Sequence, residues 1–270
     1  MPLFRPGAVL AALTFSACAH SPLSPGDLDR VRAPAFISRI EENAGPMAEV
    51  FRSDGSYRER LKSLDAQEAD RRLAAKLKTG MTRFEVSEGL RTQTLSELPQ
   101  GEPWTSSVNP ARVAGALQSF LVEEVPANAP DYNLMRPLGA DAVVEFVVTR
   151  FGMRSSGGRA GTFLEGYGRL FSLSGGGNLW YRAIRIDDVS SGQPHLDPFK
   201  VAKEPNGFRD RMLTLVSTVA SQFAKDLNPP GAARRAAEQP ALEQLKQGFG
   251  PQKMQRPTDA PGELPEADPL

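Results

Sequence analysis

Residues 142–151 read AVVEFVVTRF, and the fold depends on this stretch. The run is rich in β-branched and aromatic residues, which favour strands, and Glu145 is its only acidic residue. Both faces of a strand with this composition are nearly apolar, as in strands that are covered on both sides. We therefore predict a buried strand at the centre of a sheet.

The residues that follow predict a β-hairpin. Residues 161–173, GTFLEGYGRLFSL, and residues 179–187, LWYRAIRID, both show the two-residue alternation of strands. Between them lies SGGGN at 174–178, a composition typical of a turn. Residues 153–161, MRSSGGRAG, show no alternation, and a flexible loop is predicted there between the central strand and the hairpin.

The segments before the central strand are predicted to be mainly helical. Residues 57–78 carry apolar residues at helical spacing, with Ser56 as a cap and Gly80 as a stop. A second helix is expected over 83–98, where Thr82 and Glu85 form a capping box and Pro99 ends the pattern. Its apolar stripe is predicted to contain Phe84, Leu90, Leu95 and Leu98.

Three further elements complete the predicted domain. Residues 35–44 alternate weakly and indicate a first strand. Asn109-Pro110 marks the start of a helix, and the apolar face of that helix is predicted to contain Val113, Leu117, Phe120 and Leu121. Residues 206–227 form the clearest helix, because their apolar residues recur on a continuous stripe. The order indicates an α+β or α/β domain over 35–227, with helices packed on a mixed or antiparallel sheet. Residues 228–270 contain eight prolines and few aromatic residues, so a disordered tail is predicted.

The amino terminus, MPLFRPGAVLAALTFSACAH, has the layout of a secretory signal. Arg5 precedes an apolar run from Gly7 to Phe15, which is about half of the ~20 residues that a membrane-spanning helix needs. Small residues and then Cys18, the only cysteine of the chain, follow the run. We predict a signal peptide over 1–17, and we interpret 18–34, with its three prolines, as a tether.

Phe15-Ser16-Ala17-Cys18 resembles the bacterial lipobox, in which a leucine, a small residue and glycine or alanine precede the cysteine. The resemblance implies cleavage before Cys18, a thioether-linked diacylglycerol on its sulfur and acylation of the new amino terminus. Several acyl chains would anchor the protein stably in a membrane. Ala19 in place of aspartate implies delivery to the outer membrane, facing the periplasm.

Composition excludes several classes of protein. Lys+Arg and Asp+Glu are both 32, so no excess positive charge exists to bind nucleic acid. One cysteine excludes an intramolecular disulfide framework and any multi-cysteine zinc site, and two histidines leave few ligands for other metals. We expect no metal and no cofactor, and the sequence implies no particular oligomeric state.

The residues that could carry chemistry form no specific motif. Glu145 and Glu165 could approach each other across paired strands and act as an acid/base pair, unless Glu165 is bound by Arg169 or Arg182. A hydrolase using these carboxylates is therefore one alternative. His195 and Asp197 share a proline-flanked loop, with no nucleophile motif to accompany them, and the glycine runs at 157–161 and 175–177 lack the lysine and serine of a phosphate-binding loop.

Aromatic residues offer a second kind of site. Tyr167, Trp180 and Tyr181 lie on the predicted hairpin, and Trp104 lies in a predicted loop. Such residues usually pack in the core, but exposed ones would form a surface for a partner protein. These four residues are the candidate partner surface. A carrier of lipids or other small ligands is a further alternative, and it requires a large apolar cavity between helix 206–227 and the sheet.

The stretch from Gly139 to Asp187 resembles a segment of envelope lipoproteins. The matching runs are GADAVV at 139–144, GRLFSL at 168–173 and LWYR at 179–182. The pattern is similar to the domain of curli-secretion-like and penicillin-binding-protein-activator lipoproteins. The resemblance implies an assembly factor or adaptor without catalytic residues. The sequence thus predicts a lipid-anchored envelope lipoprotein that is not an enzyme and that binds an envelope protein partner.

Overall fold

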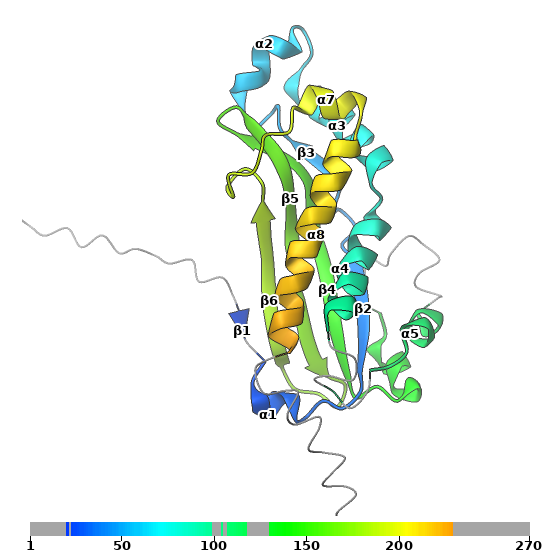
Figure 1. Cartoon of the computed structure of the whole chain (residues 1–270). Coiled ribbons are helices and arrows are strands. Elements are labelled where there is room, and N and C mark those ends of the chain that lie inside the picture. The colour runs from blue at the N-terminus through cyan, green and yellow to red at the C-terminus, as the bar shows by residue number, and fades with distance from the viewer. Residues whose placement is uncertain (1–19, 22, 99–103, 105–106, 118–129, 229–270) are drawn as a thin grey trace, which may run out of the picture. The chain divides into compact units, whose positions relative to one another are not determined.

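The computed structural model describes residues 20–21, 23–98, 104, 107–117 and 130–228 (Figure 1). The predicted signal peptide and Cys18 lie outside the described residues. The predicted tail over 229–270 and the helical positions Phe120 and Leu121 also lie outside them.

The described residues form a mixed six-stranded sheet with the strand order β1-β6-β5-β4-β2. Strand β3 pairs with β4, on the same side of β4 as β2. The pairs β4–β5, β5–β6 and β1–β6 are antiparallel, whereas β2 and β3 both run parallel to β4. Helices pack on this sheet, which confirms the predicted α+β class. The strands are β1 (His20–Ser21), β2 (Pro34–Ile40), β3 (Met47–Glu49), β4 (Ala142–Ser156), β5 (Arg159–Ser172) and β6 (Asn178–Asp187).

Strand β4 lies at the centre of the sheet, and its residues from Ala142 to Val148 are all buried, as the sequence predicted. The flexible loop predicted over 153–161 is wrong. Both β4 and β5 continue through it and are joined by Gly157 and Gly158, which have φ values of 59° and 79°. Two consecutive residues with positive φ make the tight turn that suits a hairpin, and glycine adopts that conformation without steric cost.

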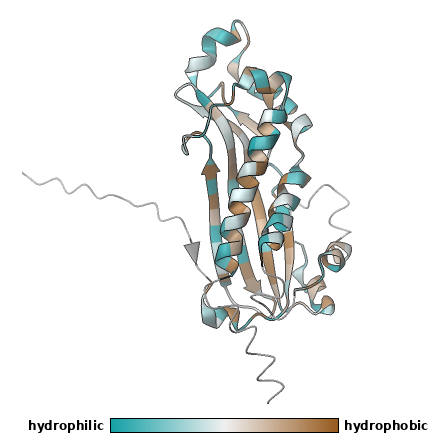
Figure 2. Cartoon of the chain, viewed as in Figure 1, coloured by the Kyte–Doolittle hydropathy of each residue, from teal (hydrophilic) through white to brown (hydrophobic). Residues whose placement is uncertain are grey.

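Helices α4 and α8 lie along one face of the sheet (Figure 1), and hydrophobic residues concentrate on the strands beneath them (Figure 2). The helical elements are α1 (Pro25–Leu28), α2 (Arg58–Leu61), α3 (Ala66–Gly80), α4 (Arg83–Glu97), α5 (Pro110–Ala116), α7 (Pro198–Lys203) and α8 (Asn206–Leu227), with 3₁₀ helices η1 (Gly55–Tyr57) and η2 (Tyr132–Leu138).

The apolar stripe predicted for α8 is confirmed, because all of its members are buried: Phe208, Met212, Leu215, Val216, Val219, Ala220, Phe223 and Leu227. Phe223 stacks on Phe146 of β4 with the ring centroids 5.1 Å apart and meets Trp180 of β6 edge-on at 5.3 Å. Gly168 of β5 lies beneath these rings, and a Cβ there would come within 2.4 Å of the indole. These side chains fill the space between α8 and the sheet, where the carrier hypothesis requires a large cavity.

The single helix predicted over 57–78 is wrong, because the chain breaks between α2 and α3. Lys62 has a φ of 56°, and Asp65 then caps α3 by accepting hydrogen bonds from the N–H groups of Gln67 and Glu68. An aspartate that caps a new helix interrupts the pattern although the composition on both sides is similar. The capping box of α4, between Thr82 and Glu85, is present as predicted.

Residues 23–34 are not a free tether, which corrects the interpretation of 18–34. Leu23, Leu28 and Val31 are buried in the main core, and α1 forms between them. The Asp141 carboxylate accepts hydrogen bonds from the backbone N–H groups of Arg32, at 2.7 Å, and Ala33, at 3.0 Å. These contacts attach the segment to the base of β4.

The second face of the sheet carries a smaller core at one end. Helices α5 and η2 cover it there, and the buried members are Ala35, Ile37, Val108, Val113, Leu117, Met135, Ala140 and Val143. Neither η2 nor α7 was predicted, because both are short and lie in proline-containing connectors.

Candidate functional site

Strand β2 forms one edge of the sheet, and part of its backbone is unpaired. The carbonyl of Pro34 accepts a hydrogen bond from the N–H of Val108 at 3.1 Å, on the side away from β4. Since successive residues of a strand direct their polar groups to alternate sides, the N–H and C=O groups of Phe36 and Ser38 face the same way. Within the described part of the chain, nothing forms a hydrogen bond with these four groups.

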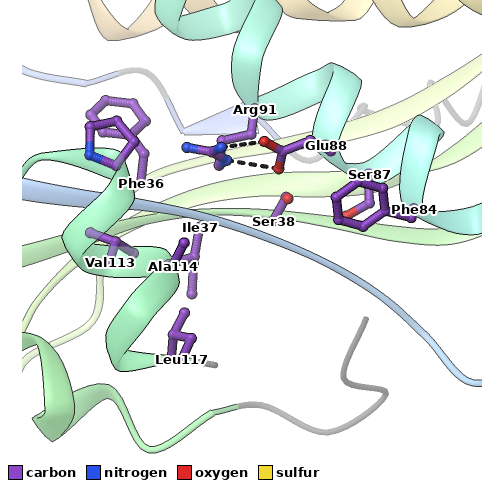
Figure 3. A pocket seen from close by; sticks show the side chains of 11 residues that line it. Phe36, Ile37, Ser38, Phe84, Ser87, Glu88, Arg91, Val113, Ala114 and Leu117 are labelled. Carbon is purple, nitrogen blue, oxygen red and sulfur yellow. Dashed lines mark hydrogen bonds and ion pairs between the residues drawn. The ribbon is translucent and has the colours of Figure 1, made fainter. Parts of the chain in front are cut away.

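An apolar groove opens along this edge, between α4 on one side and α5 on the other (Figure 3). It holds about 550 Å³ of empty space, including space open to solvent. Phe36, Ile37 and Ser38 of β2 form its floor. One wall comes from Phe84, Ser87, Glu88 and Arg91 of α4, and the other from Pro110, Val113, Ala114 and Leu117 of α5. We call this feature the β2 groove.

Two side chains of α4 are unusual in this groove. Phe84 is 53% exposed, which corrects its prediction as part of the core stripe. The buried stripe of α4 runs through Val86, Leu90 and Thr94, and Phe84 lies about 200° around the helix from Val86. Ser87 is only 1% exposed, yet its hydroxyl has no hydrogen-bond partner among the described residues. The groove was not predicted from the sequence. The spacing of the buried residues of α4 does, however, place Phe84 away from their face of the helix, and this could have indicated that Phe84 is exposed.

On the face of the sheet opposite α4 and α8, Glu145 is fully buried beneath a polar cluster. Its Oε1 accepts hydrogen bonds from Arg39 Nε at 2.9 Å and from the Tyr132 hydroxyl at 2.6 Å. Its Oε2 accepts from Arg169 Nε at 2.6 Å. The Tyr167 hydroxyl completes the cluster by accepting from Arg39 Nη2 at 3.1 Å.

The electrostatics of this cluster favour a fixed ion pair. Burial opposes the charge on Arg39, but the nearby Glu145 carboxylate outweighs burial and raises the pKa of Arg39 above its ordinary value. Burial, together with the hydrogen bond to Glu145, raises the pKa of Tyr132 to about 12. Both oxygens of the Glu145 carboxylate are therefore engaged in hydrogen bonds within the fold.

Glu165 lies on the same face as Glu145 but has its own arginines. Its carboxylate forms ion pairs with Arg150, at 3.1 Å, and with Arg154. Arg169 contacts Glu145 instead of Glu165, and Arg182 pairs with Asp226 of α8 at 2.8 Å. The hydrolase hypothesis requires two carboxylates away from arginines, and this condition is not met.

His195 and Asp197 both have structural contacts. His195 Nδ1 accepts a hydrogen bond from the N–H of Ala160 at 2.9 Å. Asp197 caps α7 by accepting from the N–H of Phe199 at 3.0 Å, and it pairs with Arg60 at 3.1 Å. Burial works against the Asp197 carboxylate, but the hydrogen bond from Arg60 lowers its pKa below the ordinary value. These structural contacts account for the positions of His195 and Asp197, and neither position requires a catalytic role beside a nucleophile.

The four aromatic residues of the candidate partner surface separate into two groups. Trp104 is 4% exposed and Trp180 is fully buried, so the prediction of an exposed surface is wrong for both. Trp180 faces α8, and its Nε1 donates to Asp226 at 3.2 Å. Tyr167 and Tyr181 lie on the opposite face, half-buried and stacked with their ring centroids 5.6 Å apart. Alternation along β6 explains the difference, because neighbouring residues point to opposite faces.

Further observations concern metals and membranes. In the part of the chain with described coordinates, no group of three or more histidine, cysteine or acidic residues is placed to hold a metal ion. No described helix is long and apolar enough to cross a membrane.

The chain matches no family model and no curated protein. The resemblance to envelope lipoproteins therefore rests on the quoted residues alone.

Proposed function

We propose that the protein is a lipid-anchored lipoprotein of the bacterial cell envelope and acts as a non-enzymatic adaptor or assembly factor through protein contacts. The observation that carries this proposal is the β2 groove, where an unpaired sheet edge lies between the apolar wall of α5 and the mixed apolar and polar wall of α4. Exposed strand edges are common sites for association with another chain. The carboxylates and the histidine that could have served catalysis are instead occupied by structural contacts.

The proposed anchor places the folded domain close to the membrane. In this proposal, a diacylglycerol on Cys18 holds the protein at the outer membrane, facing the periplasm. The sheet begins at His20, two residues after Cys18, where β1 pairs with β6. Two residues span at most about 7 Å when fully extended. An adaptor held at this distance would meet partners at or near the membrane surface.

The anchor is tested by labelling cells with a clickable palmitate and comparing the wild type with Cys18→Ala. We expect label and membrane association in the wild type, and the loss of both in the variant. Immunoblotting against a carboxy-terminal tag checks that the two proteins are made in equal amounts. An unlabelled wild-type protein in the soluble fraction would refute the lipid anchor and would remove the main support for an envelope adaptor.

A further inference from the structure

We propose that the β2 groove binds an extended peptide segment of the partner protein, which adds to the sheet as a strand beside β2. This inference rests on the proposed adaptor function and identifies the chemistry of the partner at the same site. The segment would have alternating apolar and small polar side chains, without proline at its centre.

The backbone of β2 provides the first part of the argument. Phe36 and Ser38 present two N–H donors and two C=O acceptors to the groove, with no partner among the described residues. Residues two apart in a strand are separated by about 6.6 Å, which matches the repeat of an added strand. An extended peptide can therefore bond to both residues at once, whereas a helix keeps its backbone groups for itself.

The walls of the groove determine which side chains fit. A strand lying between α4 and α5 directs alternate side chains toward each helix. The α5 wall is apolar, with Val113, Ala114 and Leu117, so it favours apolar side chains of moderate size. The α4 wall combines Phe84 with the Ser87 hydroxyl and the ion pair between Glu88 and Arg91, so it favours small polar side chains.

Ser87 is an independent indication of an occupant. Its hydroxyl is almost completely buried at the groove and lacks a hydrogen-bond partner in the described structure. Buried polar groups are normally paired, and a polar side chain of an added strand would pair this one. Replacement of Ser87 by alanine is therefore expected to weaken peptide binding, by about 2- to 12-fold for the loss of one hydrogen bond.

The same geometry favours a peptide over a second copy of the chain. Strand β2 lies between α4 and α5, both of which line the groove above its edge (Figure 3). Two copies that paired through β2 would bring these four helices against one another before the strands could meet. A single extended segment avoids this collision.

The test uses the full mature chain with Cys18→Ala and a fluorescent peptide in which valine and serine alternate, with a lysine at each end. A peptide of the same composition, with its valines and serines in separate blocks, is the control. We expect the alternating peptide to bind at least tenfold more tightly in fluorescence anisotropy. Hydrogen exchange at the Phe36 and Ser38 amides, measured by NMR, is expected to be fast in the free protein and to slow at least tenfold with peptide.

A pair of matched variants locates the site. Ala114 is exposed and lines the groove, so Ala114→Arg places a long charged side chain in it. Ala111 is exposed on the same helix outside the groove, so Ala111→Arg is the control. Both changes exchange residues of similar helix propensity. We expect Ala114→Arg to weaken binding at least tenfold and Ala111→Arg to leave it within about twofold of the wild type.

Several results would overturn the inference and leave the lipid anchor untouched. Slow exchange at Phe36 and Ser38 in the free monomer would mean that the chain itself covers the edge. A dimer that Ala114→Arg dissociates would identify a second copy as the occupant. Equal binding of both peptides, or binding that Ala114→Arg does not change, would exclude strand addition in the groove.

Discussion

Replacing Glu145 by glutamine tests the role of the buried carboxylate beneath the polar cluster. Glu145 is fully buried, and the two arginines that pair with it are 10% and 26% exposed in their side chains. Glutamine has nearly the same shape, but it removes the negative charge and turns an amide donor toward a guanidinium group. The change therefore leaves Arg39 and Arg169 without their counter-charge and adds almost no cavity.

The expected loss of stability follows from these exposures. Removing one partner of a buried ion pair costs about 3–5 kcal/mol. Since Arg169 retains some contact with water, we expect the lower end of this range, about 3 kcal/mol. For a domain of this size each kcal/mol lowers the melting temperature by about 2–4 °C, so the fall should be about 6–12 °C.

Urea unfolding followed by tryptophan fluorescence measures the free energy of unfolding directly. An unchanged slope against urea would show that the variant unfolds in the same two-state manner. Glu165→Gln is the matched control, because the Glu165 side chain is 24% exposed, whereas that of Glu145 is fully buried, and its partner Arg150 is 40% exposed. Such exposed pairs contribute about 0–1 kcal/mol. A loss below about 1 kcal/mol for Glu145→Gln, or an equal loss for both variants, would refute the reasoning.

Three further predictions concern other parts of the fold. Gly168→Ala should cost about 1–3 kcal/mol in urea unfolding, because its methyl group would lie 2.4 Å from the Trp180 indole and 3.0 Å from the Phe223 ring, so these rings would have to shift. Between pH 10 and about 12, calorimetry should show a falling stability, since an unfolded tyrosine ionises near pH 10 while Tyr132 keeps its proton to about 12. This contribution is fully present below pH 10, and Tyr132→Phe should make the fall shallower by up to about 1.4 kcal/mol per pH unit. Thr82→Ala should cost about 1 kcal/mol by removing the cap of α4, and an unchanged unfolding midpoint would contradict that role.

The central elements of the fold could be predicted from the sequence because their patterns are long and local. Strand β4 contains a nearly continuous apolar run of about ten residues, and the β5–β6 hairpin and helix α8 each show one periodicity along their length. The break at Lys62 could not be predicted in this way, because the residues on both sides share a helical composition. The parallel pairing of β2 and β3 with β4 joins segments about 100 residues apart, and no local pattern encodes it.

The candidate site depended even more on tertiary packing. The sequence placed Trp180 and Tyr181 next to each other in the hairpin, but only the position of α8 decides that Trp180 is buried and Tyr181 is not. Glu145 was identified as a candidate acid, yet its two arginines come from different strands. The β2 groove requires α4, α5 and the open edge together, so no single segment could have revealed it.

The most direct test of the adaptor is photo-crosslinking in living cells. A photoreactive amino acid is placed at Ala114 in the wild-type, membrane-anchored protein, and the same residue is placed at Ala111 as the control. We expect a discrete crosslinked partner protein from position 114 and none from position 111. The same products from both positions, or no product from position 114 when the protein is membrane-bound, would contradict a protein-binding role for the β2 groove.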